Sequence, residues 1–377
     1  MPKSRRAEAI WIEARNRWQL NVQQDGKRKT FTSSIPGRRG KHEAEAKADD
    51  WLDAGQPDDL RFDAAWAMYL DYLKQNTGTA NHYAAETIGR NWILDSDETK
   101  RISRKRLSKI KLSDLQELVT AVGLAGRSKR TCKNVKDKLS GFFHYAEKQG
   151  WEFRVDPTKI ILPTQAKVGK RKVVQPDALK VLFSADTIKK HGHDVPCFYV
   201  HAFRFLVVTG YRRGELCGFQ HSDYDAPILT VNRSINEHNE ITQGKNTNAR
   251  RTNVLSKRAQ QILEDQQAML KKLGIKSPWL FPDREGGHLD PRNLYHYWVR
   301  TYTKQHGISA SLHELRHTFI SIARIEMPEA LLKDFVGHSV SMDTFGVYGH
   351  EIDGEKQRAA DIIDTVFDRV LSSEGTQ

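Results

Sequence analysis

Four short segments in the second half of the chain bring together residue types that can bind an anion or move a proton. Arginine carries a permanent charge on a planar fork of donors, and histidine exchanges protons near neutral pH. Gly210 permits a tight turn after the apolar run 203–208, so the first segment presents Arg212 and Arg213. The segments are TGYRRGEL (209–216), ITQGKNTNARRTNVL (241–255), SLHELRH (311–317) and VGHSVSMDTFGVYGH (336–350).

Taken one at a time, each segment also has an ordinary structural explanation. Arg212 and Glu215 have the i, i+3 spacing of a surface ion pair, and Lys245 suits a solvent-exposed hairpin. His313 and Arg316, one helical turn apart, could be structural, and Tyr348 could be an ordinary half-buried tyrosine. The functional interpretation therefore depends on the four segments occurring together and in order.

Together the segments resemble the tyrosine recombinase (phage integrase) family. The pattern of that family is a TG-x-R-x-x-E turn, a lysine in a β-hairpin, a helical H-x-x-R, and a G-H followed by a tyrosine. All four parts occur here in that order, within residues 176–370. The residues before them are similar to integrases of temperate phages and conjugative transposons, which carry a small basic arm-binding domain and a helical core-binding domain.

The resemblance implies that Glu215 is a supporting acidic residue and that the catalytic set is Arg212, Lys245, His313, Arg316, His338 and Tyr348. Arg212 is chosen over Arg213 because it follows TG-x directly and precedes the acidic residue by three positions. The family's reaction is DNA breaking and rejoining through a 3′-phosphotyrosine, here on Tyr348, without a cofactor, ATP or a metal ion. We therefore expect a site-specific recombinase that integrates and excises a mobile element, such as a phage genome.

Elementary chemistry agrees with these roles. Attack on a phosphodiester places extra negative charge on its non-bridging oxygens, and arginine forks suit that charge. The two histidines can add hydrogen bonds to the same phosphate, and His313 can also assist proton transfer at the tyrosine. Crowding against arginines lowers the pKa of a lysine, so Lys245 could protonate the leaving 5′-hydroxyl.

The segment from His313 to His317 also spells H-E-x-x-H, the signature of a zinc-protease helix. Two histidines four residues apart could bind zinc, with Glu314 as the general base. Ser311 and Glu314, however, form a capping-box pattern that would use the glutamate at the start of the helix. A zinc-dependent hydrolase is therefore a remote alternative, which a chelator would distinguish from a recombinase.

Two further alternatives share the expected catalytic fold. A type IB topoisomerase uses similar tyrosine, arginine and lysine chemistry, but it relaxes supercoils without exchanging DNA partners. A small basic domain ahead of a helical one favours the recombinase, because a second DNA-binding module is useful at attachment sites. A non-catalytic DNA-binding protein is disfavoured because every nucleophilic and charge-stabilising position of the pattern is filled.

The composition fits a protein that acts on a polyanion. The 377 residues carry a formal net charge of +13, and release of counterions from phosphates would drive binding to DNA. No apolar stretch reaches ~20 residues and the start does not read as a signal peptide, so we expect a cytoplasmic protein of a bacterial host without a membrane partner. Of three widely spaced cysteines, Cys132 and Cys217 lie in apolar helical patterns that predict buried thiols.

The resemblance also implies the partners of the protein. These are double-stranded DNA attachment sites and a homotetramer that forms on them, with a host DNA-bending factor and an excisionase as further candidates. The stretch 355–371 looks like an amphipathic helix. We hypothesise that its apolar face docks on a neighbouring subunit, with packing on its own domain as the alternative.

We expect a multidomain, mainly α protein with small β-sheets. The expected parts are a basic sheet plus helix at 1–56 for arm-type DNA, a helical core-binding domain at 57–165, a basic linker at 166–175, and a mixed α+β catalytic domain at 176–377. In the first part, Asp25-Gly26 predicts a turn into a return strand at 27–33, followed by a helix at 42–55. In the second, Ser113 and Gln116 suggest a capping box.

Basic residues in three places are candidate DNA contacts. They lie on the return strand of the first sheet, along one stripe of a helix expected at 128–149, and in the linker. Most charged stripes are merely solvated, so the stripe alone does not decide between the two interpretations. The candidates are Lys27, Arg28, Lys29, Lys129, Lys133, Lys136, Lys170, Arg171 and Lys172.

Overall fold

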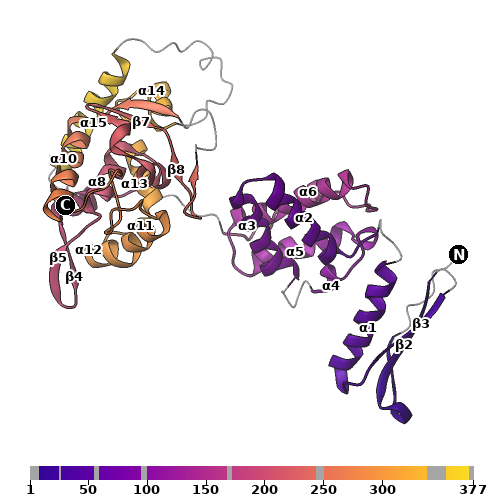
Figure 1. Ribbon diagram of the computed structural model, residues 1–377. Helices are drawn as coiled ribbons and strands as arrows, with labels where there is room; N and C mark the ends of the chain where they lie inside the picture. Colours follow the sequence, from indigo (N-terminus) through magenta and orange to yellow (C-terminus); the bar gives the residue numbers. More distant parts are fainter. Residues whose placement is uncertain are drawn as a thin grey trace. The chain divides into compact units, whose positions relative to one another are not determined.

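The protein is mainly helical with small antiparallel sheets, as expected (Figure 1). The computed structural model describes residues 8–24, 27–54, 59–94, 100–167, 172–242, 250–337 and 354–372. The chain divides into two compact units, Met1–Gly169 and Lys170–Gln377, and each is described by itself. No described helix combines the length and the apolar character that crossing a bilayer requires.

The first unit begins with a three-stranded antiparallel sheet in the order β1-β2-β3, covered by helix α1. Its elements are β1 (Ile10–Ile12), the 3-10 turn η1 (Glu13–Arg15), β2 (Arg17–Gln24), β3 (Lys27–Ser33) and α1 (Gly37–Ala54). The predicted return strand is confirmed, whereas the Asp25-Gly26 turn lies outside the described residues. The predicted start of the helix at residue 42 is wrong, since α1 begins at Gly37. Position 40, in the first turn of this helix, requires a glycine because a Cβ there would collide with the backbone of Ile35.

The rest of the first unit is a helical bundle with an aromatic core. Its elements are α2 (Phe62–Asn76), α3 (Thr79–Ile88), the π-helix η2 (Gly89–Leu94), α4 (Lys100–Ser103), η3 (Leu107–Lys109), α5 (Leu112–Leu124), α6 (Lys129–Lys148) and η4 (Pro157–Lys159). The predicted apolar stripe of α6, which includes the Cys132 thiol, is buried. The Ser128 hydroxyl caps this helix by accepting the Thr131 N–H at 3.1 Å.

The predicted capping box at Ser113 and Gln116 is wrong, because α5 begins two residues too early for it. The cap residue is Lys111, whose N–H donates to the Asp114 carboxylate at 2.9 Å. The Gln116 side chain instead bonds to the backbone of Ile161, donating to its oxygen at 2.9 Å and accepting its N–H at 2.8 Å. The Gln116 side chain, which the local pattern assigned to the cap, therefore makes a long-range contact instead.

The second unit surrounds one buried helix with other helices and three small sheets. Its helices are α7 (Pro176–Ser184), α8 (Val200–Thr209), α9 (Arg213–Gly218), η5 (His221–Asp223), α10 (Lys257–Lys272), α11 (Pro291–Tyr297), η7 (Trp298–Tyr302), α12 (Thr303–His306), α13 (Leu312–Ala323), α14 (Glu329–Val336) and α15 (Glu355–Ser372). Its strands are β4 (Thr187–Lys190), β5 (His193–Pro196), β6 (Tyr224–Asp225), β7 (Ile228–Val231), β8 (Ser234–Ile235), β9 (Ile241–Thr242) and β10 (Arg251–Val254). They form a sheet in the order β10-β7-β6 and two hairpins, β4-β5 and β8-β9.

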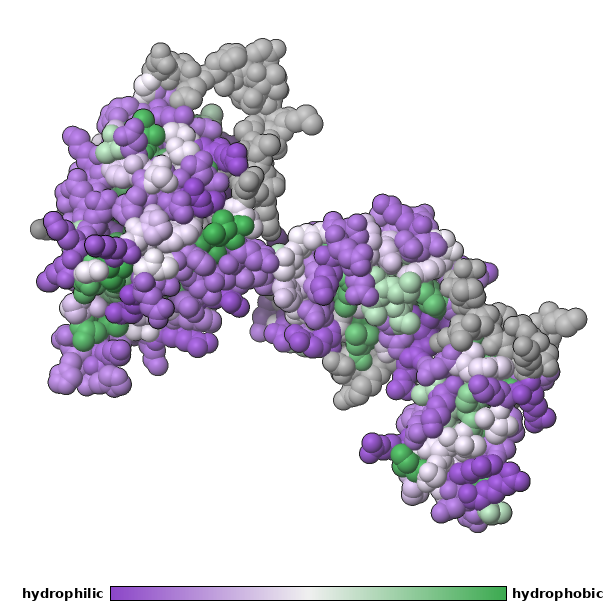
Figure 2. Space-filling view, viewed as in Figure 1, coloured by the Kyte–Doolittle hydropathy of each residue, from purple (hydrophilic) through white to green (hydrophobic). Residues whose placement is uncertain are grey.

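Helix α8 is the centre of this unit and is packed between α10 and α13 (Figure 1). Nine of its ten residues are buried, in keeping with the apolar run in the sequence. On the face shown in Figure 2, hydrophilic residues cover most of the surface and hydrophobic residues form small separate patches. Because α8 is almost completely buried, it serves as a rigid base for the turn that follows it at Gly210.

The turn at Gly210 has a conformation that only glycine can adopt without strain. Its φ is +64°, and a Cβ built there would overlap the ring of Phe319 on α13. We expect Gly210→Ala to lower the free energy of unfolding by about 2–4 kcal/mol, from the left-handed backbone and from overpacking together. Gly274→Ala is the matched control, because Gly274 has φ +71° and open space around it, and should cost roughly 1–2 kcal/mol. Equal losses in urea titrations of the two variants would contradict the close packing at Gly210.

In the single chain the apolar face of α15 packs on its own domain, as the alternative expected from the sequence has it, and docking on a neighbouring subunit stays a prediction. The helix contacts α7, α13, α14 and β10. Its buried residues are Ala359, Ala360, Ile363, Val366 and Phe367, of which all but Ala360 belong to the main cluster of this unit. Because burial removes this face from solvent, the amphipathic pattern is explained within one chain.

Candidate active site

Arg212 and Glu215 form a partly buried ion pair at the start of α9. Arg212 is the residue that precedes the helix, and its N–H donates to Oε2 of Glu215 at 2.9 Å. Its Nη1 donates to Oε1 of the same carboxylate at 2.8 Å. The Glu215 side chain is only 4% exposed, whereas that of Arg212 is 42% exposed. The pair is therefore not an ordinary surface ion pair, and Arg212 is its solvent-facing member.

Arg251, on β10, is a site residue that sequence reasoning missed. Its Nη1 and Nη2 donate to the two Glu215 oxygens at 3.2 and 3.0 Å, and its side chain is 6% exposed. The sequence offers Arg250 and Arg251 side by side, and only the pairing of β10 with β7 decides which one points inward. The alternation that places Arg251 and the buried Asn253 on one face of the strand is the signal that could have identified it.

Arg316 approaches the same place from α13. It is 2% exposed, and it donates to the carbonyl oxygens of Gly210 at 2.6 Å and Val336 at 2.8 Å. Burial, together with the charges of Arg212 and Arg251, lowers the pKa of Arg316 to about 9, although Glu215 opposes the shift. An anion bound beside Arg316 would reduce the electrostatic repulsion among the three arginines.

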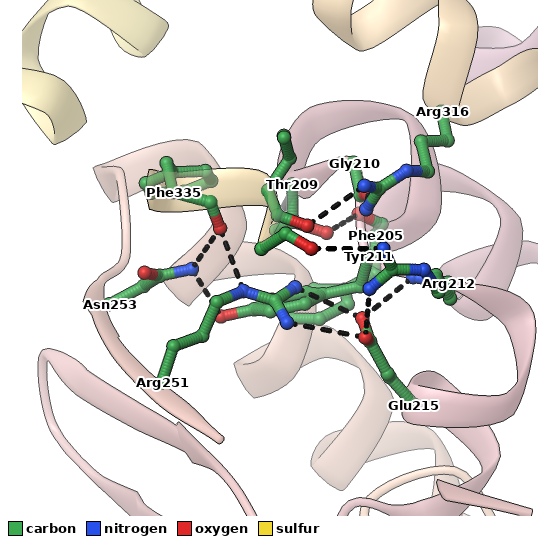
Figure 3. Close-up of polar contacts among 12 residues, drawn as sticks. Phe205, Thr209, Gly210, Tyr211, Arg212, Glu215, Arg251, Asn253, Arg316 and Phe335 are labelled. Carbon is green, nitrogen blue, oxygen red and sulfur yellow. Dashed lines mark hydrogen bonds and ion pairs between the residues drawn. The ribbon is translucent and has the colours of Figure 1, made fainter. Parts of the chain in front are cut away.

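The end of α14 is held by all three arginines (Figure 3). Arg251 donates to the carbonyl of Phe335 at 2.8 Å, Arg316 to that of Val336 at 2.8 Å, and Arg212 to that of Gly337 at 3.0 Å. These are carbonyls that a helix C-terminus leaves without a partner inside the helix, and the helix dipole favours positive charge beside them. Three consecutive backbone oxygens thus fix three guanidiniums that come from three different elements.

The remaining predicted catalytic residues divide into one that is described and three that are not. His313 is exposed on α13, one turn before Arg316, and its ring centroid lies 4.5 Å from that of His317. Lys245, His338 and Tyr348 lie outside the described residues. The structure therefore brings together Arg212, Arg316 and Glu215 and places His313 on the same helix as Arg316.

Glu314 is used as a helix cap. Its carboxylate accepts the N–H of Ser311 at 2.6 Å and that of Lys172 at 3.2 Å, which confirms the capping role expected from the sequence. Burial raises the pKa of Glu314, but these hydrogen bonds outweigh burial and hold the pKa below its ordinary value. A carboxylate held in this way is poorly suited to act as the general base of a zinc hydrolase.

Comparison with known proteins identifies the domain that carries this site. Residues 172–355 match the model of the phage integrase family. These residues form a tyrosine recombinase domain of that family. The chain is similar to a "tyrosine recombinase XerC-like" protein of Caldanaerobacter subterraneus subsp. tengcongensis, with 23% identity over 87% of this chain and 90% of the relative.

Solved structures share the fold of the recombinase. The Tn1549 transposon integrase, in complex with transposon right end DNA, is 20% identical and has a TM-score of 0.61 over 80% of this chain and 99% of that one. The lambda integrase tetramer bound to a Holliday junction is 17% identical and has a TM-score of 0.58 over 91% of this chain and 97% of that one. Because the second unit is little more than half of the chain, both similarities extend into the first unit of the recombinase.

The candidate DNA-contact residues of the recombinase differ in their exposure and in the bonds that their side chains make to other residues of the chain. Arg28, Lys29, Lys129 and Lys172 are exposed, and the Lys29 ammonium lies 5.4 Å from the centroid of the Phe31 ring. Lys133 pairs with Asp137 at 2.7 Å. Lys136 donates to the carbonyls of Thr158 and Ile160 at 2.8 and 2.7 Å, so its ammonium helps to hold the segment after α6. Nothing is described of the Lys27 side chain or of Lys170 and Arg171.

The Glu215 carboxylate makes the stability of the recombinase depend on pH. Burial raises its pKa, but the hydrogen bond and charge of Arg251, with those of Arg212, lower the pKa below its ordinary value. A carboxylate with a lowered folded-state pKa stabilises the protein above its unfolded pKa of roughly 4.3, and the stabilisation is lost as pH falls through the folded value.

We therefore expect Glu215→Gln to cost about 3–5 kcal/mol at pH 7, because it leaves buried guanidinium groups without their partner. The difference from wild type should narrow as the pH falls below the unfolded pKa of roughly 4.3, because the wild-type side chain then takes up a proton on unfolding. Calorimetric unfolding from pH 7 to pH 3 measures both effects. The exposed Glu285→Gln is the control. A constant difference across this range would show that the charge of Glu215 is not what stabilises the cluster.

Proposed function

We propose that this recombinase cleaves and rejoins DNA strands at the attachment sites of a mobile element through a covalent 3′-phosphotyrosyl bond to Tyr348. The observation that carries the proposal is the charge of the arginine cluster, defined as Arg212, Arg251 and Arg316 around Glu215. Three guanidiniums face one carboxylate, so these four side chains together carry two more positive charges than negative ones. A partly buried site with this excess charge favours a phosphate.

Arg212 and Arg316 are the arginines that would bind the scissile phosphate. Arg212 presents its open side to solvent, and both residues now donate to the neutral carbonyls at the end of α14. A phosphate oxygen carries a full charge and makes stronger hydrogen bonds than a carbonyl, so it competes well for these donors. The donors would then face the oxygens on which charge develops during attack.

The nucleophile of the reaction is Tyr348 rather than the tyrosine inside the cluster. Tyr211 lies with its ring 5.0 Å from the Arg251 guanidinium, but it is 1% exposed. Its hydroxyl accepts a hydrogen bond from Asn253 at 3.1 Å, and burial raises its pKa. A buried phenol with a raised pKa cannot reach or attack a DNA phosphate, which supports the family position at Tyr348.

The chemical step is a transesterification that conserves the number of phosphoester bonds. The phenolate oxygen of Tyr348 forms a bond to phosphorus while the bond from phosphorus to the 5′-oxygen breaks. Lys245 gives a proton to that leaving oxygen, and His313 assists proton transfer at the tyrosine. His338 adds a hydrogen bond to the phosphate. Because the bond energy is retained, a 5′-hydroxyl of a partner strand reverses the step without ATP or a metal ion.

Integration and excision require two duplexes, so we infer that four copies of the chain assemble on DNA. The basic sheet of the first unit would bind arm-type sites, and the helical bundle would bind core sites. Arg28 and Lys29 on the sheet and Lys129 on the bundle are exposed and available for phosphate contacts. We further propose that the mobile element is a phage or a conjugative element. A host DNA-bending factor and an excisionase are the further partners of the recombinase.

The proposal can be tested without knowledge of the target sequence. The full chain is incubated, in EDTA and without ATP, with a library of duplexes that carry random sequence on both sides of a single nick. Cleavage just 5′ of the nick releases a short fragment, so rejoining fails and the covalent complex accumulates. We expect a protein–DNA complex that survives denaturant, and sequencing of the captured DNA should reveal one preferred target duplex.

The outcomes separate the proposal from its alternatives. A zinc hydrolase or a non-catalytic DNA-binding protein would give no covalent complex under these conditions. A topoisomerase would give the complex, but it would not transfer the captured strand to a second duplex with the same target sequence. Either result would overturn the proposed recombination.

A further inference from the structure

Arg251 bonds both to Glu215, the partner of Arg212, and to the end of α14. The cleavage reaction requires these two parts of the site to hold a fixed position relative to each other. Arg251 shares both oxygens of Glu215 with Arg212: Oε1 accepts from the Nη1 atoms of both arginines, and Oε2 accepts from Arg212 N and Arg251 Nη2. Its Nε donates to the carbonyl of Phe335 in the last turn of α14. The chain leaves this helix at Gly337, immediately before His338.

The surroundings of Arg251 leave little freedom for its guanidinium. One face lies against the Tyr211 ring, whose hydroxyl is held by Asn253, and Asn253 also donates to the Phe335 carbonyl at 2.9 Å. Gly337 has φ +65°, and a Cβ built there would lie 2.8 Å from Arg251 Nη1. The end of α14 and the guanidinium are thus fitted to each other at contact distance.

We propose that Arg251 is a positioning residue for the cleavage reaction: through Glu215 it orients Arg212, and through Phe335 it holds the end of α14 from which the chain continues to His338 and Tyr348. The inference rests on the proposed function. Arg251 directs three of its donors at Glu215 and Phe335, and both of its Nη atoms bind a charged carboxylate. It is therefore less able to release donors to a phosphate than Arg316, which donates to neutral carbonyls. It acts through Arg212, which is open to solvent.

The role requires the fork of an arginine and not only its charge. A lysine ammonium at this position is a point charge on a flexible stem, and it cannot satisfy both Glu215 oxygens and the Phe335 carbonyl in one plane. In Arg251→Lys the total charge is unchanged, so binding of the DNA backbone should be preserved. Arg212 would lose its fixed orientation, and a displacement on the order of 1 Å can slow a reaction by about 10²-fold.

The test uses the full chain and the target duplex captured from the random library, in its nicked form. Single-turnover cleavage at saturating protein and the Kd for the duplex are measured for wild type and for Arg251→Lys. Both are also measured on a duplex with a methylphosphonate at the scissile position, where a neutral methyl group replaces one charged oxygen. A neutral phosphorus centre needs less help from Arg212, so a defect that acts through Arg212 should shrink on this substrate.

Arg204→Lys is the matched control. Arg204 is also buried in this unit, donates from Nε to the carbonyl of Leu182 at 2.8 Å, and pairs with Asp186 at 2.6 Å. It therefore loses a comparable set of contacts away from the arginine cluster. We expect this variant to cleave both substrates within about threefold of wild type, because no donor aimed at the phosphate is disturbed.

We expect Arg251→Lys to cleave the natural duplex about 10²-fold more slowly, with Kd within about twofold of wild type and a much smaller deficit on the methylphosphonate. Equal slowing on both substrates would reduce Arg251 to a structural residue, and wild-type cleavage or a defect confined to Kd would also overturn the inference. If Arg251→Lys does not fold, Glu215→Gln disturbs the same connection and should show the same pattern. Failure of wild type to cleave would instead refute the proposed function.

Discussion

Arg316→Lys should slow single-turnover cleavage by about 10²–10³-fold while the protein still binds its target duplex. The guanidinium of Arg316 donates from one nitrogen to the turn at Gly210 and from another to Val336 at the end of α14. A lysine retains the positive charge but offers donors from a single nitrogen. It therefore cannot keep the turn at Gly210 in place and contact a phosphate oxygen at the same time.

This prediction is measured with the nicked target duplex at saturating protein, with Kd determined in parallel. Arg324→Lys is the control, since Arg324 is exposed at the end of the same helix. We expect the control to cleave at the wild-type rate, because a surface substitution away from the site changes little. Cleavage by Arg316→Lys within threefold of wild type would mean that Arg316 does not stabilise the developing charge.

Tyr348→Phe should form no covalent complex with the nicked duplex, because the variant lacks the oxygen that attacks phosphorus. Its affinity for DNA should stay within about twofold of wild type, since the basic residues that displace counterions are unchanged. Among the tyrosines of this domain, Tyr211 is enclosed and its pKa is raised by burial, so it cannot replace the missing nucleophile.

The adduct assay is run with Tyr295→Phe as the control, because Tyr295 is a partly exposed tyrosine of the same domain beside Arg213. This control should accumulate the covalent complex at the wild-type level. Formation of a complex by Tyr348→Phe, or its loss in Tyr295→Phe, would place the nucleophile elsewhere in the chain.

Local patterns predicted those parts of the site in which neighbouring residues in the sequence also interact. The turn after the apolar run, the spacing of Arg212 and Glu215, and the cap formed by Glu314 all depend on residues within one helical turn. Glu215 and Glu314 each accept a backbone N–H that the start of the helix leaves without a partner inside the helix, and Gly210 supplies the left-handed backbone of the turn. Such geometry is set by the helix itself and is therefore visible in the sequence.

The parts that local patterns missed depend on contacts between distant segments. Arg251 differs from Arg250 through the register of β10 against β7. The carbonyls that hold the arginines belong to the end of α14, and each is at least twenty residues from the arginine that binds it. Gln116 is a second example, because its side chain bonds to the distant Ile161 and does not cap α5. The site was recognised from an ordered set of motifs, whereas the contribution of Arg251 became visible only in the fold.

The central claim is that the phenol oxygen of Tyr348 attacks a phosphate held by the arginine cluster, and it can be tested directly by mapping the covalent complex. Wild-type protein trapped on the nicked target duplex is digested with a protease and a nuclease, and the modified peptide is sequenced by mass spectrometry. The account predicts a single modified peptide, with Tyr348 joined to the 3′-phosphate of a nucleotide. Attachment to any other residue, or through a 5′-phosphate, would contradict it.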